Sequence, residues 1–103
     1  MLIEDLLNTG EEKAISKDNI MKALNIETER DFYRELETER KAGAVICSSS
    51  KGGFYLPKTA DEVSRFLHKM DARAKTTIDV IQSAKDLHER MKAETFGVNY
   101  GNL

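Results

Sequence analysis

The fold is decided by the stretch Ser16–Leu56, which reads SKDNIMKALNIETERDFYRELETERKAGAVICSSSKGGFYL. Ser16 has the chemistry of a helix N-cap, and Asp18 in the following turn suits the positive end of a helix dipole. Apolar residues then recur at helical spacing, from Ile20 to Leu24. These features predict a first helix in this stretch, ending near Asn25.

A second helix is predicted after a very short connection. Thr28 is its N-cap, with Asp31 three residues later as a weak capping box, and Gly43 ends it. Two helices joined by a turn of three or four residues form a helix-turn-helix unit. The sequence therefore predicts this unit between Ser16 and Gly43.

Two extended segments follow the second helix. Ala44–Ser48 is rich in β-forming residues, Ser49–Gly52 is a turn signal, and Gly53–Leu56 is a second strand that Pro57 stops. A hairpin directly after a helix-turn-helix unit is a wing.

The flanking segments complete the expected fold. Ile3, Leu6 and Leu7 predict a short helix that precedes the unit. Thr59 with Glu62 forms a capping box for a long last helix. We therefore expect a mainly α fold with a small β-hairpin (α+β), a winged helix-turn-helix followed by a long C-terminal helix. The expected segments are 1–58 for the winged domain, 59–93 for the helix and 94–103 for a flexible tail.

The second helix of the unit sorts its charges by face. At 100° per residue, Phe32 and Leu36 share the buried side, while Arg30, Arg34 and Lys41 cluster within about 40° on the opposite side. Such a helix enters the major groove and presents side chains to base edges, while lysines and hydroxyls hold phosphates. Double-stranded DNA is thus the predicted partner. The predicted DNA-binding residues are Thr28, Arg30, Tyr33, Arg34, Thr38, Lys41, Ser49 and Lys51.

Other interpretations of this face remain open. Charged residues on the outside of a surface helix are commonly only solvated, and Glu37 lies within the basic stripe, where it repels phosphate. The net charge of the chain is −2, whereas nucleic-acid-binding domains are often strongly basic. The alternative is a winged-helix protein-interaction module in a replication or packaging assembly, with a phage or host protein as partner and no DNA binding.

The last helix is long for a small domain. From Ala60 to about Lys92 it would span roughly 50 Å, so it must bend, break or find a partner. Its apolar residues recur in alternating steps of four and three, the spacing of a coiled coil. We expect a homodimer through this helix; the alternative is packing on its own domain through residues from Val63 to Met70. The predicted dimerisation residues are Val63, Leu67, Met70, Ala74, Ile78, Ile81, Leu87 and Met91.

Composition argues against several classes of protein. The single cysteine, Cys47, lies in an apolar segment and is expected to be a small buried hydrophobe. The two histidines, His68 and His88, lack metal-ligand spacing, and no nucleophile–base set or phosphate loop is evident. We therefore expect no enzyme, metal or cofactor. With no signal peptide and no apolar run of membrane-spanning length, a cytoplasmic protein is expected.

The chain resembles a known family over roughly residues 2–70. The segments that carry the resemblance are Ile26–Phe32, Glu39–Gly43 and Ile46–Leu56. They resemble the DNA-binding domain of biotin-repressor-type winged helices, above all small phage and prophage proteins. The resemblance implies a DNA-binding role in transcription control or phage replication. The chain departs from the family in the acids of its second helix, and no effector domain follows, so a ligase role is not implied.

Overall fold

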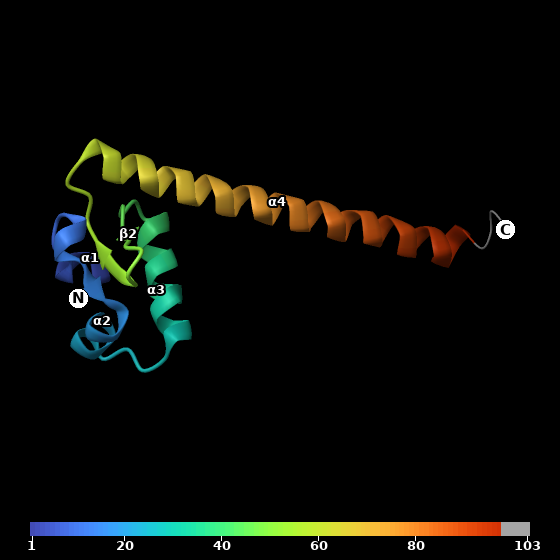
Figure 1. The fold of residues 1–103 in the computed structure, drawn as a ribbon. Helices are drawn as coiled ribbons and strands as arrows, with labels where there is room; N and C mark the ends of the chain where they lie inside the picture. Colours follow the sequence, from blue (N-terminus) through green and yellow to red (C-terminus); the bar gives the residue numbers. More distant parts are fainter. Residues whose placement is uncertain (98–103) are drawn as a thin grey trace. The chain divides into compact units, whose positions relative to one another are not determined.

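The computed structural model describes the backbone of residues 1–97 and the side chains of residues 1–94. The chain forms a small, mostly helical domain with a three-stranded antiparallel sheet and a long C-terminal helix, in a winged-helix-like arrangement. This confirms the predicted fold class. Figure 1 shows the first three helices gathered around the sheet. The elements are α1 (Ile3–Leu6), η1 (Glu11–Lys13), β1 (Ile15–Ser16), α2 (Lys17–Leu24), α3 (Glu29–Lys41), β2 (Cys47–Ser48), β3 (Gly53–Tyr55) and α4 (Ala60–Gly97).

The ends of α2 and α3 follow from local chemistry. The Ser16 hydroxyl accepts a hydrogen bond from the backbone of Asn19 at 3.2 Å, and Thr28 does the same for Asp31 at 3.1 Å. Each cap satisfies a backbone N–H that has no partner within its helix. Asn25 ends α2 in the left-handed conformation, with φ of 56°. Both predicted caps are confirmed.

The sheet has the strand order β1-β3-β2, and both pairings are antiparallel. The wing turn, residues 49–52, closes through a 2.7 Å bond from the Ser49 N–H to the Gly53 carbonyl, with Gly52 at φ of +88°. Gly53 is favoured for a different reason. A Cβ there would lie 3.0 Å from that of Ala14, because β1 and β3 approach closely at this point.

The first predicted strand of the wing is shorter than expected. The sequence predicted Ala44–Ser48, but only Cys47–Ser48 pairs with β3. The Ala44 N–H bonds to the Glu39 carbonyl at 3.0 Å, and the Ile46 carbonyl accepts from the Arg40 side chain. These residues therefore bond to the end of α3 instead of entering the ladder.

The core lies between the three short helices and the sheet. Phe32 is fully buried on the inner side of α3, and its ring lies 5.3 Å from that of Phe54 on β3. This confirms the inner face predicted for the second helix of the unit. The core cluster consists of Ile3, Leu7, Ile20, Phe32, Leu36, Ala44, Ile46 and Phe54.

The chain divides into two compact units, Met1–Leu67 and the residues from His68 onward. The first unit includes the start of α4, where the Glu62 N–H donates to the Thr59 hydroxyl and the Thr59 N–H to the Glu62 carboxylate. The predicted capping box is thus present. The helix continues to Gly97, into the segment 94–103 that the sequence led us to expect as a tail. Residues 98–103 lie outside the described part, and none of the described helices has the length and apolarity to cross a membrane.

Candidate nucleic-acid interface

The outer side of α3 carries the residues predicted to contact DNA. Phe32 and Leu36 anchor the opposite side of the helix in the core, where Glu39 is also buried. The exposed side chains include Arg30, Arg34, Thr38 and Lys41. Tyr33 is half exposed at the edge of this face. The structure brings these predicted residues together on one exposed surface, which we call the α3 face and define as Arg30, Tyr33, Arg34, Thr38 and Lys41.

The cations of the α3 face have only loose partners. Arg34 lies 3.9 Å from Asp31, and Lys41 lies 4.0 Å from Glu37. Exposed ion pairs of this kind contribute little because solvent screens them. Within the described residues, Arg30 makes no hydrogen bond or ion pair. These cations can therefore turn to an external anion at small cost.

The start of α3 is more tightly organised. Lys17 of α2 forms an ion pair with Glu29, and its ammonium lies 5.8 Å from the centre of the Tyr33 ring. The hydrogen bond with Glu29 raises the pKa of Lys17. The Thr28 hydroxyl is already an acceptor for the helix cap, so it has only its proton to offer a phosphate. Lys17 joins the two helices of the unit, a role that the sequence did not indicate.

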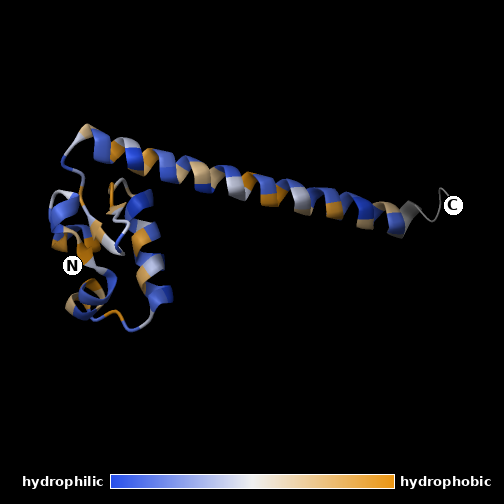
Figure 2. Cartoon of the chain, viewed as in Figure 1, coloured by the Kyte–Doolittle hydropathy of each residue, from blue (hydrophilic) through white to orange (hydrophobic). Residues whose placement is uncertain are grey.

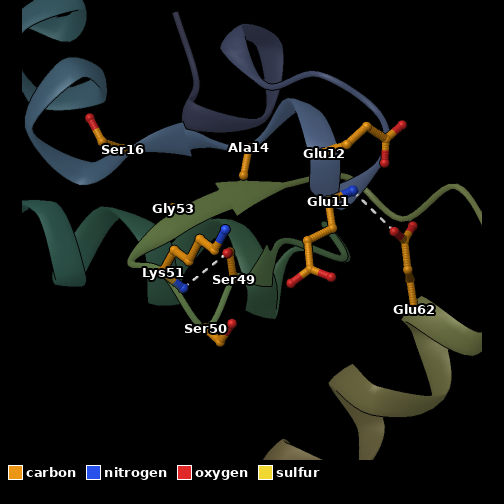
Figure 3. Close-up of a pocket in the computed structure, with 9 residues that line it drawn as sticks. All are labelled: Glu11, Glu12, Ala14, Ser16, Ser49, Ser50, Lys51, Gly53 and Glu62. Carbon is orange, nitrogen blue, oxygen red and sulfur yellow. Dashed lines mark hydrogen bonds between the residues drawn. The ribbon is translucent and has the colours of Figure 1, made fainter.

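The wing turn borders a surface hollow of about 620 Å³ (Figure 3). Ser49, Ser50 and Lys51 line one side, and the Ser49 hydroxyl accepts a 3.1 Å hydrogen bond from the Lys51 backbone. Glu11 and Glu62 lie on the lining as well. Their carboxylates make the hollow unfavourable for phosphate, so anion contacts by the wing are expected at its exposed tip, Ser50 and Lys51.

Glu39 has a structural role that sequence reasoning missed. The sequence indicates only an acid of the second helix, without a structural role. In the structure its side chain is buried. Its two carboxylate oxygens accept hydrogen bonds from the backbone N–H groups of Ile3 at 2.7 Å and Glu4 at 2.8 Å. The carboxylate thereby caps the start of α1, where the helix dipole favours negative charge. No local signal could have revealed this, because the partners are 36 and 35 residues away.

A second acid of α3 is affected by this cap. Glu35 is half-buried one turn earlier, and a hydrogen bond with Glu39 raises the pKa of Glu35, with burial adding to the effect. A proton on Glu35 lets it donate to Glu39 and removes the repulsion between the two carboxylates. Glu39 is therefore internal and is not one of the exposed acids of α3.

Arg40, next to this cap, does not belong to the exposed cations. Its guanidinium Nε donates to the Ile46 carbonyl at 3.0 Å, and the group lies 5.4 Å from the centre of the Phe66 ring. The side chain thus connects the end of α3 with the segment before the wing and with the first turns of α4. Its charge is directed into the first unit.

The base of the wing is held to the start of α4 by Glu62. Its buried carboxylate accepts backbone hydrogen bonds from Lys58 at 2.6 Å and Glu11 at 3.0 Å, and these bonds lower the pKa of Glu62. The Arg65 guanidinium bonds to the Glu11 carboxylate at 3.0 Å. Glu11 lies at the start of η1, where the sequence predicted no element, and its carboxylate is paired with Arg65.

The residues predicted for dimerisation occupy two environments. Val63 and Met70 are half-buried, and the others are exposed. Among the large apolar side chains of the predicted set, Ile78 is 64% exposed, and Leu67 and Met91 are each 55% exposed. Within residues 1–94, no cluster of three or more histidine, cysteine or acidic side chains is arranged to hold a metal ion.

The chain matches no protein-family model, no curated protein and no solved structure at a significant level. The fold and the α3 face by themselves define a small winged-helix-like domain with a mixed-charge α3 face and a long C-terminal helix.

Proposed function

We propose that the chain binds double-stranded DNA in the cytoplasm, as a transcription regulator or an accessory of phage replication, and that it binds rather than catalyses. The observation that supports the proposal best is the α3 face. It is an exposed set of cationic, aromatic and hydroxyl side chains on the second helix of a helix-turn-helix unit. In winged helices this helix is the element that enters the major groove.

The side chains of the α3 face suit different parts of a duplex. Arginine forms two parallel hydrogen bonds with guanine, so Arg30 and Arg34 are assigned to base edges, with Tyr33 and Thr38 beside them. Lys41 at the end of α3 and Lys51 at the wing tip are assigned to phosphates on either side. Glu37 lies within this set, and its place beside a base requires a cytosine amino group as donor.

The first experiment is a titration of the full-length protein into random-sequence duplex DNA at about 50 mM and 200 mM salt. We expect binding that weakens steeply with salt, because phosphate contacts release counterions. Selection of a preferred site follows. Absence of binding to mixed sequences at the lower salt would contradict the proposal.

Arg34 then tests the α3 face itself. Arg34→Ala should cost about 1–3 kcal/mol of binding to the selected site if the side chain reads a base. Arg90→Ala, which removes the same charge from an exposed position of α4, is the matched control and should leave the affinity nearly unchanged. Equal effects of the two substitutions would remove Arg34 from the interface.

The alternative is a protein-interaction module without DNA binding. It is favoured by the acids that remain beside the cations of α3, Asp31 and Glu37, and by the exposed apolar side chains of α4. The same titration separates the two functions, because this module ignores DNA even at low salt.

A further inference from the structure

Large apolar side chains are exposed on the described residues of the second unit. Every described residue from 71 to 94 is exposed. These residues include four large apolar side chains, with exposed fractions of 64% for Ile78, 63% for Val80, 47% for Ile81 and 49% for Leu87. Figure 2 shows apolar residues recurring along α4 between polar ones. Recurrent exposed apolar groups of this kind mark a surface that binds a partner.

The residues of α4 have the spacing of a coiled coil, with Ile81 in the seam and Ile78, Val80 and Leu87 on its edges. A seam with alternating steps of four and three runs through Ala74, Thr77, Ile81, Ala84, His88 and Met91. One edge of the seam, the first edge, consists of Asp71, Ile78, Lys85 and Lys92; the other, the second edge, consists of Arg73, Val80, Leu87 and Glu94. The edges of a coiled coil set the choice of partner and its direction, because their side chains meet across the interface.

A parallel pair of these helices has poorly matched edges. In that arrangement a residue of the second edge meets the partner's first-edge residue five positions later. Arg73 would face Ile78 and Val80 would face Lys85, while Leu87 would face Lys92. Each contact sets an apolar side chain against a charged one, so the parallel arrangement gains no attractive charge pair.

An antiparallel pair matches, because each edge then faces the same edge of the partner. With Ile81 opposite the partner's Ala84, Arg73 faces the partner's Glu94 and Asp71 faces the partner's Lys92. Val80 faces the partner's Leu87. By symmetry each contact occurs twice. Ile78 meets Lys85, whose aliphatic stem can lie over it while the ammonium stays in water.

The side chains of the seam also fit one another in size in this register. Ala74 lies opposite the partner's Met91 and Ile81 opposite the partner's Ala84, so each layer combines a large and a small side chain. The two polar residues, Thr77 and His88, share a layer. The Thr77 hydroxyl already donates to the Arg73 carbonyl at 3.0 Å, which leaves its oxygen to accept from an imidazole N–H.

We propose that residues 71–94 bind the same segment of a second copy as an antiparallel coiled coil, with Ile81 opposite the partner's Ala84. The occupant of the apolar face is thus another copy of this chain. The proposal is independent of DNA binding. The two copies of Asp71 would lie about 30 Å apart along the coiled coil, since the first edge places 21 residues between them at 1.5 Å each.

Charge reversal tests the direction of pairing. In sedimentation of the full-length protein we expect a two-chain mass, and Arg73→Glu or Glu94→Arg should each raise the dissociation constant by roughly tenfold, because two pairs become repulsive. The double variant should return to within about twofold of the parent, since both ion pairs re-form with exchanged signs. Arg90→Glu, on the outer side of the coiled coil, is the matched control and should change little.

Only the antiparallel dimer brings positions 73 and 94 close enough for one substitution to compensate for the other. Within one helix, or in a parallel pair, the two lie about 30 Å apart along the axis. A one-chain mass at high micromolar concentration, or a double variant as weak as the product of the single ones, would overturn the proposal.

Spin-label distances provide a second measurement. Labels at Ser83→Cys should lie close together, because position 83 is near the two-fold axis of the proposed dimer. Labels at Ala72→Cys should be about 30 Å further apart along the axis. Cys47 is buried and is not expected to take up label. Equal distances at the two positions would indicate parallel helices and refute the antiparallel pairing.

Discussion

The unit Met1–Leu67 and the unit from His68 onward use apolar residues in opposite ways. In the first unit, Phe32 and Ile20 are fully buried among helices and strands. In the described part of the second unit, residues 68–97, Ile78 and Ile81 are exposed on a single helix. The first unit therefore has a core of its own. In the described residues, the second unit is a single helix, so its apolar residues gain from burial only when something outside that unit covers them.

Core truncation should show the largest difference between the two units. Phe32→Ala removes a fully buried ring and should lower the free energy of unfolding by about 4 kcal/mol. Ile81→Ala should change it by less than about 0.5 kcal/mol when the protein is diluted below the dissociation constant of the proposed dimer. Urea denaturation of both variants tests this. A large loss from Ile81→Ala in the monomer would mean that the helix is covered within its own chain.

Removing the helix cap formed by Glu39 should have the next largest effect on the free energy of unfolding. Glu39→Gln keeps the shape but offers one acceptor oxygen to two backbone donors, so we expect a loss of about 2 kcal/mol in the free energy of unfolding. Glu37→Gln, two residues away and exposed, is the matched control and should be nearly neutral. If both substitutions were equally mild, the bonds from Glu39 to Ile3 and Glu4 would not stabilise the first unit.

The smallest effect concerns the connection between η1 and the start of α4. The pKa of Glu62 is lowered in the folded chain, so its contribution to stability is complete above the ordinary pKa of 4.5 and is lost as the pH falls through the folded value. Glu62→Gln should lower the melting temperature by about 5 °C at neutral pH. The gap from the parent should close in acid. A gap independent of pH would show that the charge of Glu62 is not what matters.

Local chemistry made much of the fold predictable. Ser16, Thr28 and the pair Thr59–Glu62 act on backbone groups within four residues, so their roles can be identified in the sequence. The inner side of α3 was also predicted, because helical periodicity places Phe32 and Leu36 together.

Long-range contacts account for what the sequence did not indicate. Glu39 looks like any acid on a surface helix until α1 is folded against it, and its partners are more than thirty residues away. The pairing of Glu11 likewise has no local signal, because its partner, Arg65, is 54 positions later. The shortened first strand of the wing has the same origin, since the bonds made by Ala44 and Ile46 depend on where α3 ends.

Two neighbouring glycines of the wing, Gly52 and Gly53, restrict substitution for different physical reasons. Gly52 has open space around it but a positive φ, so an asparagine, which tolerates the left-handed region, is its least costly replacement. Gly53 has no such dihedral requirement, yet a Cβ there would lie only 3.0 Å from the Cβ of Ala14 and 3.2 Å from the Ile15 carbonyl oxygen, so these neighbours would have to move. One position is thus restricted by torsion and the other by volume, and no single compensating change elsewhere would relax both.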